Sequence, residues 1–441
     1  MKSIYRGRIL TFHQDTDFDK LLQIKPHTLF IDKKHLTFIR DGALIVENGI
    51  ITKIDDFHKI KHEITTEDDF IDYGDAILTP GFIDMHIHTN QTSVASYSGK
   101  DIVKWLDEQA FPTEIQFRSE EYAKREYTML LKQLFKNGTT SIVGMLPSYY
   151  DTADLMFEIT DSFSMRAILG NTIMTEGHPA LTTNPESSIL ISEHIYSKWH
   201  GVNRLSYSLS PRFALSCNEM TFALCSQFLK THPNTYFHTH LAESIKESVD
   251  SVKKFPHAKD NLAIYEQYNL INDKSIFAHC LHLTENEYHR LEQKKAIIVN
   301  CPSSNNYMGS GSFDYSKLDH YKFRFGFGSD WGAGNTLSML RVMDDAHKLS
   351  TQKEYHWEPL SRWYLATLGA ARALGLEKYI GSLEVGKEAD FIVIDPSQNE
   401  LLLHRLESSY DLLDYLFNLC AFGDDRIIIA TYIFGNKVYG I

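Results

Sequence analysis

Residues 79–88 have the sequence Thr79-Pro80-Gly81-Phe82-Ile83-Asp84-Met85-His86-Ile87-His88, in which a Pro-Gly break opens a short β-prone stretch that ends in two histidines. Because side chains alternate between the faces of a strand, His86 and His88 point to the same side. Two imidazoles that project together from a strand end can bind one metal ion. The pair alone is a weak signal in a chain with 21 histidines, where satisfied polar side chains at a strand end are the simpler explanation.

Three other polar residues end short β-prone runs elsewhere in the chain. They are His240, His279 and Asp330, at the ends of residues 234–240, 275–279 and 324–330. In a (β/α)₈ barrel the C-terminal strand ends surround one pocket, so residues far apart in sequence meet there. Three neutral imidazoles and one carboxylate would hold a divalent cation and leave a position for water, as in catalytic sites. The predicted metal ligands are His86, His88, His240 and Asp330.

Two of these assignments have competitors. His238 lies on the same face of its strand as His240. We favour His240 because Glu243 follows three residues later, close enough to enter the same pocket, and we expect His238 in the core or beside a ligand. Asp330 could instead cap the following helix, but its place behind the last apolar strand favours the ligand role.

Strand and helix patterns alternate through the middle of the chain. Besides residues 82–88, short apolar runs occur at residues 140–145, 167–171, 205–210, 236–240, 276–279, 296–300 and 325–329. Most are separated by helical stretches such as residues 120–136, which end at a C-cap signature, Asn137-Gly138. Thr284 and Glu287 form a capping box at another helix start. This alternation implies a parallel sheet, and with eight candidate strands we favour a closed (β/α)₈ TIM-type barrel in an α/β fold.

The two ends of the chain have β-strand patterns instead. Residues 42–54 are two β-prone runs around Asn48-Gly49, a strong hairpin signal, and residues 390–395 and 426–430 are also β-prone. We expect both termini to build one small β-sandwich domain. The predicted boundaries are residues 1–75 and 379–441 for the two parts of this domain and residues 76–378 for the barrel.

The composition is that of a globular protein, with 43% hydrophobic and 23% charged residues in 441. A net charge of −13 argues against a nucleic-acid backbone or an anionic membrane as the main partner. No apolar segment has the length of a bilayer span or a signal peptide. The five cysteines have no C-x-x-C pairing, which suits the reducing cytoplasm and argues against a structural zinc site.

Together these residues resemble the amidohydrolase superfamily. The superfamily-level matches are residues 80–88, 240–243, 328–330 and 381–390 and the strand-end His279. Narrower matches are similar to the guanine deaminase family, at Gln91 and residues 105–106, 111–114, 210–217 and 301–305. The resemblance covers nearly the whole chain. It departs from the family pattern at Asn90 and at residues 331–334, which bears on fine substrate preference.

The resemblance implies hydrolytic deamination of guanine to xanthine and ammonia by a metal-activated water. One zinc ion per chain is the expected cofactor, and Fe²⁺ is also compatible with these ligand types. The cation is expected to lower the pKa of a bound water toward neutrality. Asp330 is expected to accept the proton of that water, His279 to orient it, and Glu243 to carry a proton to the ring nitrogen and the departing amine. The alternative for Glu243 is an exposed carboxylate on the first turn of a helix.

Arg212 and Phe213 are the candidate recognition pair. Guanine presents O6 and N7 acceptors, which match an arginine fork, and an aromatic ring can stack on the purine. Gln91 can bond the lactam edge, and Glu243 would also contact substrate. Otherwise Arg212 would be a surface ion-pair partner and Phe213 a core residue. Residues 100–114 are either an ordinary amphipathic helix or a cover that excludes water from the purine.

Two other functions compete with this one. A sibling amidohydrolase would act on another heterocycle, such as a pterin, triazine, cytosine or adenosine-type substrate, and Arg212 is the discriminating residue. A non-catalytic amidohydrolase scaffold would lack part of the metal set, which is complete here. The resemblance also implies a homodimer whose only other partner is the small purine substrate.

Overall fold

The computed structural model describes residues 2–23, 35–94 and 102–441. It divides into two compact units. The barrel unit comprises Asp84–Leu131 and Ile142–Thr336, and the terminal unit comprises Met1–Ile83, Lys132–Ser141 and Leu337–Ile441. The domain boundaries at residues 75/76 and 378/379 stay a prediction.

Eight strands form one sheet in the order β12-β11-β10-β9-β8-β7-β6-β5. They are β5 (Phe82–His88), β6 (Thr139–Leu146), β7 (Arg166–Ile173), β8 (Leu205–Pro211), β9 (Tyr236–Leu241), β10 (Ser275–His279), β11 (Ile297–Asn300) and β12 (Arg324–Phe327). Strands β7 to β12 pair in parallel with their neighbours. The first and last strands meet beyond β12, where the Asp330 N–H donates to the His86 carbonyl over 2.9 Å. The predicted (β/α)₈ barrel is therefore confirmed.

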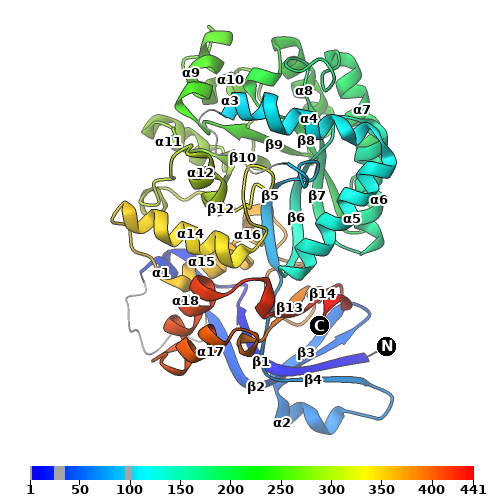
Figure 1. The fold of residues 1–441 in the computed structure, drawn as a ribbon, viewed down its shortest axis with the longest axis vertical. Helices are drawn as coiled ribbons and strands as arrows, with labels where there is room; N and C mark the ends of the chain where they lie inside the picture. The colour runs from blue at the N-terminus through cyan, green and yellow to red at the C-terminus, as the bar shows by residue number, and fades with distance from the viewer. Residues whose placement is uncertain (1, 24–34, 95–101) are drawn as a thin grey trace. The chain divides into compact units, whose positions relative to one another are not determined.

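The helices of the barrel unit stand around these strands (Figure 1). They are α3 (Ile102–Trp105), the π-helix η2 (Leu106–Ala110), α4 (Phe111–Ile115), η3 (Gln116–Arg118), α5 (Glu120–Lys136), α6 (Tyr150–Ser162), α7 (Pro185–Trp199), η4 (Ala214–Ser216), α8 (Glu219–Thr231), α9 (Ile245–Lys254), α10 (Asn261–Gln267), α11 (Glu285–Gln293), α12 (Pro302–Met308) and α13 (Lys317–His320). Helix α5 has the predicted bounds, and Gly138 follows it with a φ of 79°. The predicted capping box of Thr284 and Glu287 begins α11.

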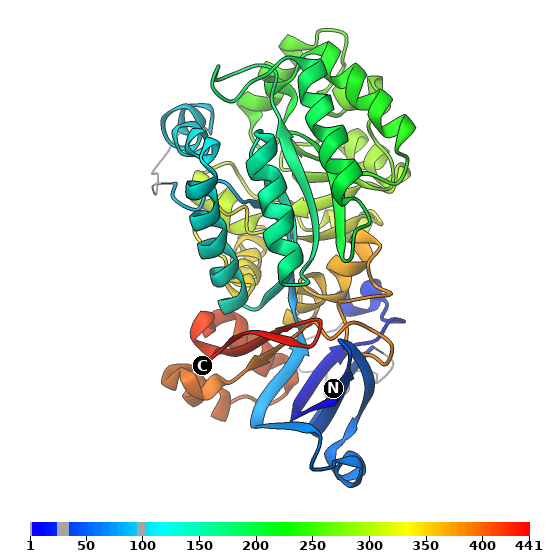
Figure 2. The ribbon, with the colours of Figure 1, turned by 90° about the vertical axis from the view of Figure 1, so that its right-hand side faces the viewer.

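The terminal unit contains a seven-stranded mixed sheet in the order β15-β14-β13-β4-β1-β2-β3 (Figure 2). Its strands are β1 (Lys2–Phe12), β2 (Leu36–Glu47), β3 (Ile50–Asp56), β4 (Asp69–Pro80), β13 (Phe391–Ile394), β14 (Ile428–Ile433) and β15 (Asn436–Gly440). The predicted hairpin turn joins β2 and β3, with φ angles of 51° at Asn48 and 80° at Gly49. Tyr5, Phe391 and Tyr432 pack their rings in one core, so strands from both termini share a hydrophobic interior.

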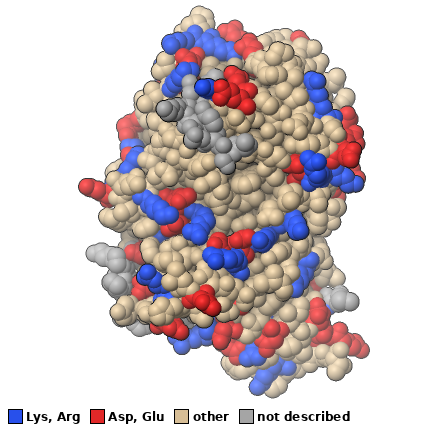
Figure 3. Space-filling model, viewed as in Figure 1, with Lys and Arg blue, Asp and Glu red and all other residues tan. Residues whose placement is uncertain are grey.

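The remaining elements of the terminal unit are helices. They are α1 (Phe18–Leu22), α2 (Phe57–Ile60), η1 (Lys61–Glu63), α14 (Met339–Gln352), α15 (Pro359–Leu365), α16 (Leu368–Leu374), η5 (Pro396–Gln398), α17 (Glu400–Glu407), α18 (Leu412–Phe422) and η6 (Asp425–Ile427). Within the described ranges, no helix combines the length and the apolar composition that a membrane span requires. The described basic and acidic side chains on the face in Figure 3 are interspersed in small groups, rather than gathered into a field of one sign.

Candidate metal centre and active site

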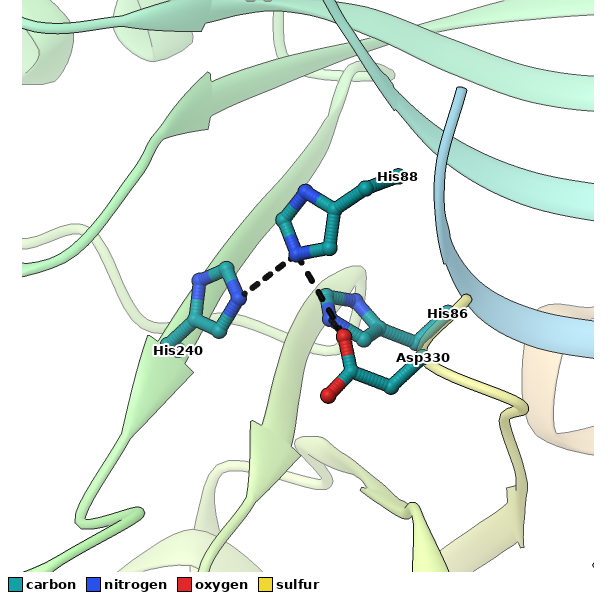
Figure 4. A group of neighbouring side chains, drawn as sticks. All are labelled: His86, His88, His240 and Asp330. Carbon is teal, nitrogen blue, oxygen red and sulfur yellow. Dashed lines mark hydrogen bonds and ion pairs between the residues drawn. The ribbon is translucent and has the colours of Figure 1, made fainter. Parts of the chain in front are cut away.

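Four side chains converge at the C-terminal ends of the barrel strands (Figure 4). They are His86, His88, His240 and Asp330, and each offers one ligand atom within 4.8 Å of the others. The His88 and His240 Nε2 atoms are 3.1 Å apart. The Asp330 Oδ1 atom lies 3.3 Å from His86 Nε2 and 3.4 Å from His88 Nε2. The structure therefore brings together the residues that the sequence singled out as ligands.

The backbone explains why these side chains meet. His86 and His88 alternate with Ile87 at the end of β5, so both rings point to the same face. Asp330 follows β12 with a φ of 49°, a left-handed conformation that non-glycine residues rarely adopt. The buried Asp84 carboxylate accepts hydrogen bonds from the Ser329 N–H over 2.9 Å and the Ser329 hydroxyl over 2.5 Å. These bonds hold the chain that carries Asp330 against β5.

Two imidazoles are oriented by a hydrogen bond at the nitrogen that faces away from the centre. The His240 Nδ1 atom lies 2.7 Å from the Arg212 carbonyl, which only accepts, so Nδ1 carries the proton and Nε2 presents a lone pair. The His86 Nδ1 atom lies 2.8 Å from His238 Nε2. His238 is thus beside a candidate ligand. This is one of the two places, core or ligand neighbour, that the sequence analysis expected for it.

Burial favours the neutral, metal-binding form of these rings. It lowers the pKa of His86, and it lowers the pKa of His88 and of His240 well below the usual histidine value. Among the described residues, His86 Nε2 and Asp330 Oδ1 are buried without a hydrogen-bond partner. Buried polar atoms without a partner are rare, and a shared cation would satisfy both. The donor set fits a divalent metal ion with nitrogen and oxygen ligands.

Glu243 and His279 border this group. The His279 Nε2 atom lies 3.7 Å from Glu243 Oε2 and 3.9 Å from Asp330 Oδ2. Burial raises the pKa of Glu243, although His279 opposes the shift, so the carboxyl holds a proton more readily than an exposed glutamate. The His279 ring is fixed through Nδ1, 2.8 Å from Asn305 Oδ1. Both side chains are therefore placed to act on a molecule beside the metal group.

A cavity opens next to these residues. Its lining consists of His88, Trp105, Leu106, Arg212, Phe213, His240, Glu243, Glu247, Asp330 and Ala333. The predicted recognition pair, Arg212 and Phe213, therefore faces the same space as the ligand group. Trp105 and Leu106 come from the segment predicted as a possible cover, of which residues 100 and 101 lie outside the described ranges.

Two side chains of helix α4 contact Arg212. Both oxygens of Glu114 accept from Arg212 Nη1, at 3.0 and 2.9 Å, and the Arg212 guanidinium carbon lies 5.3 Å from the centre of the Phe111 ring. Glu114 Oε1 also accepts from Gln91 Nε2 over 2.6 Å. Gln91 is thus joined to Arg212 through a carboxylate, and it lines a neighbouring hollow with Trp105 rather than the cavity itself.

Several residues at the site carried no role in the sequence prediction. They are Glu114, Glu247, Ser304 and Asn305. Ser304 donates to Asp330 Oδ2 over 2.5 Å, and Glu247 lines the cavity from the first turn of α9, which begins two residues after Glu243. The closeness of Glu247 to Glu243 in the sequence was a signal for its place at the site, whereas nothing local to Glu114 indicates its contact with Arg212.

Comparison with known proteins agrees with this geometry. Residues 77–438 match the Amidohydrolase family. The guanine deaminase of Escherichia coli (strain K12) is 37% identical over 406 residues, which cover 92% of this chain and 92% of that protein. A solved structure of E. coli guanine deaminase superposes with a TM-score of 0.94 at 34% identity, covering 100% of this chain and 99% of the other. The structure of guanine deaminase from C. acetobutylicum with bound guanine in the active site has a TM-score of 0.86 at 26% identity, with 100% of both chains covered. The chain therefore belongs to the amidohydrolase family, in the group that contains the guanine deaminases.

Proposed function

We propose that the protein hydrolyses guanine to xanthine and ammonia. One observation carries the proposal: the buried group of three imidazoles and one carboxylate opens on the same cavity as Arg212, Phe213 and Glu243. A metal group alone would fit many hydrolases, whereas an arginine and an aromatic ring beside it fit the O6 and N7 edge and the face of a purine. The relatives named as guanine deaminases support the same substrate.

We propose one zinc ion per chain as the cofactor, with His86, His88, His240 and Asp330 as its ligands. When bound, it would supply Lewis-acid activation of the hydrolytic water. Neutral histidines and a carboxylate are also acceptable to Fe²⁺, so metal analysis decides between the two ions.

Glu243 is the proposed proton carrier. As the water oxygen bonds to C2 of guanine, the adjacent ring nitrogen gains an electron pair and must be protonated, and Glu243 donates to it. Asp330 accepts the proton that the water loses, and His279 orients the water between the two carboxylates. The proton of the C2 hydroxyl then passes through Glu243 to the departing amine, the C2–amine bond breaks as the C2 carbonyl forms, and ammonia and xanthine are formed. The proton held by Asp330 returns to Glu243, which resets both carboxyl groups. The raised pKa of Glu243 suits this exchange because the buried carboxyl holds a proton more readily than an exposed glutamate does.

Recognition is assigned to Arg212, Phe213 and Gln91. Arg212 is 3% exposed, so a purine that left its N–H groups unpaired would be bound poorly. Adenine lacks the O6 acceptor, and rejection by up to roughly 10⁴-fold is expected. The part of the predicted cover that the structure describes places Trp105 and Leu106 against the cavity, where they would exclude water from the purine.

A substrate panel on metal-loaded protein tests the proposal. Guanine, adenine, a pterin, a triazine and cytosine are supplied separately, ammonia and product are followed, and metal content is measured on the same sample. Turnover of guanine well above the others supports guanine deamination. Preferential turnover of another heterocycle would assign the chain to a sibling activity, and a chain that cannot be loaded with metal would be a scaffold.

Three further proposals rest on the family resemblance. The enzyme acts in purine catabolism, it works in the cytoplasm, and it is a homodimer. The five cysteines are buried free thiols, which suits a reducing compartment. Light scattering on purified protein at several concentrations tests the homodimer.

A further inference from the structure

The recognition side chains share a buried counter-ion. Arg212 and Glu114 are both nearly inaccessible, with side-chain exposures of 4% and 3%. Both oxygens of Glu114 accept from Arg212 Nη1, and one of them, Oε1, also accepts from Gln91 Nε2. Two residues that would read different parts of the substrate are therefore fixed by one carboxylate.

This carboxylate changes what Arg212 can bind. A buried arginine without a counter-charge strongly favours an anionic ligand, because a carboxylate or phosphate matches its fork. Here the guanidinium charge is already balanced by Glu114, and Nη1 is occupied. The remaining N–H groups of Arg212 are left for neutral acceptors such as the O6 and N7 atoms of a purine.

The same carboxylate fixes the polarity of Gln91. A carboxylate only accepts hydrogen bonds, so the Gln91 amide must turn its Nε2 atom toward Glu114. Its Oε1 atom is buried and, within the described residues, has no hydrogen-bond partner. Gly332, with a φ of 119°, leaves room for it, since a Cβ at this position would lie 1.9 Å from Oε1. Gln91 is thus preset as an acceptor for an N–H group of a ligand that reaches from the cavity into the adjoining hollow that Gln91 lines.

We propose that Glu114 is a positioning residue that presets the recognition site for a neutral lactam and against its anion. It does so by holding Arg212 and Gln91 in place and by cancelling the charge of Arg212. The inference rests on the proposed function, since it concerns how guanine is told apart from the product xanthine.

The acidity of the product explains why a neutralised arginine would be useful. Hydrolysis at C2 replaces the amine by a carbonyl, and the ring N–H groups beside the carbonyls become imide-like. Xanthine therefore loses a proton more readily than guanine does. A site whose arginine is already neutralised would release the xanthine anion, whereas an uncompensated arginine would retain it.

The first test uses the unaltered, metal-loaded enzyme. Calorimetry measures the dissociation constant of xanthine from about pH 6 to about pH 9, across the ionisation of xanthine. We expect xanthine binding to weaken as the anion forms. Binding that tightens over this range would overturn the proposal, and this measurement needs no variant.

The second test uses two variants of Glu114. Glu114→Gln removes the charge at nearly the same size, and we expect the xanthine anion to bind roughly tenfold tighter than to the unaltered enzyme. The KM for guanine should rise by about tenfold, because Arg212 and Gln91 lose their common anchor, while kcat changes by less than about threefold. Glu114→Asp keeps the charge but shortens the reach, so it should raise KM without tightening anion binding. A Glu114→Gln enzyme with unchanged KM and unchanged xanthine affinity would refute the assignment.

Glu266→Gln is the matched control. It removes a carboxylate from Arg290, another arginine of the barrel unit, which is outside the cavity lining. We expect it to lower thermal stability without altering KM or xanthine affinity. If the proposed function is wrong, the unaltered enzyme will not turn over guanine. If only this inference is wrong, that turnover is intact.

Discussion

Buried carboxyl groups around one cavity differ in their partners, and the partners give each a different role. Asp330 faces two imidazoles, Glu243 faces His279, and Glu114 faces Arg212. Among the residues that the structure describes, Glu247 accepts from the neutral side chains of Ser251 and Asn261, both at 3.2 Å, and forms no ion pair. A neighbouring cation favours the charged form of a carboxyl and burial favours its protonated form, so Glu243, which is buried beside His279, is subject to both effects.

Glu243→Gln tests the proton carrier. Glutamine keeps the size of the side chain and can still accept from the Ser310 hydroxyl, which lies 3.3 Å from Glu243 Oε1. It cannot donate and recover a proton at the ring nitrogen, so we expect kcat to fall by roughly 10²- to 10⁴-fold. Steady-state kinetics measure kcat, and calorimetry measures the affinity for guanine. Guanine affinity and metal content should stay within about threefold, and a variant with nearly full kcat would exclude Glu243 as the carrier.

Glu247→Gln tests the pH dependence of stability. Burial raises the pKa of Glu247 to about 7, above its value in the unfolded chain. Between these two pKa values the folded protein binds more protons than the unfolded chain, so stability falls as pH rises toward 7. Glutamine mimics the protonated carboxyl, so the variant should match the enzyme near pH 4.5 and exceed its stability by about 3 kcal/mol above pH 7.

Thermal unfolding at a series of pH values, on metal-loaded protein, measures the effect of Glu247→Gln. Glu158→Gln, at an exposed position of α6, is the control and should give a difference that does not change with pH. A Glu247→Gln difference that is also flat with pH would show that this carboxyl is ionised in the folded protein.

At the scale of single elements, the sequence predicted what local chemistry determines. Asn48-Gly49 specifies its hairpin turn through two positive φ angles, and Thr284 with Glu287 specifies the start of α11 through reciprocal hydrogen bonds. The π-helix η2 was not predicted, and neither was the contact of α4 with Arg212. Glu114 and Arg212 are 98 residues apart, and their pairing depends on how α4 packs over the barrel rather than on any local pattern.

Gly328→Ala tests how the last strand meets the first. A Cβ at Gly328 would lie 2.7 Å from His86 Cβ and 2.9 Å from the His86 backbone nitrogen, and backbone atoms cannot yield as a flexible side chain can. We expect a loss of about 1–3 kcal/mol in the free energy of unfolding, together with weaker metal binding, because His86 must shift. Denaturant unfolding and metal titration measure the two effects.

Gly201→Ala is the control for Gly328→Ala. Gly201 has a φ of 78° and open space around its Cβ position, so alanine there adds backbone strain without a clash. It should lower stability by about 1 kcal/mol and leave metal affinity unchanged. Equal metal affinity in both variants would contradict rigid packing of Gly328 against His86.

At the scale of the whole molecule, the candidate ligands come from the beginning, middle and end of the barrel. His86 and His88 end β5, His240 is in β9, and Asp330 follows β12. The sequence indicated this convergence because a barrel brings all its strand ends to one rim. It could not indicate the orienting bonds from the Arg212 carbonyl and from His238, since these depend on the register between strands.

Metal removal therefore reports on the fold as well as on catalysis. A cation held by β5, β9 and the segment after β12 binds only the folded chain, so it stabilises that chain by RT ln(1 + [L]/Kd). With free metal at about 100 times Kd, this amounts to about 2.7 kcal/mol, which for a chain of this size corresponds to a Tm rise of about 3 °C. Scanning calorimetry after chelation, and then at increasing zinc concentrations, should show a Tm that climbs with the logarithm of free metal. Asp330→Asn should weaken the dependence of Tm on metal by weakening the site, while Glu158→Gln should show the same dependence as the unaltered protein. A Tm of the unaltered protein that does not change with metal would mean that the cation binds elsewhere.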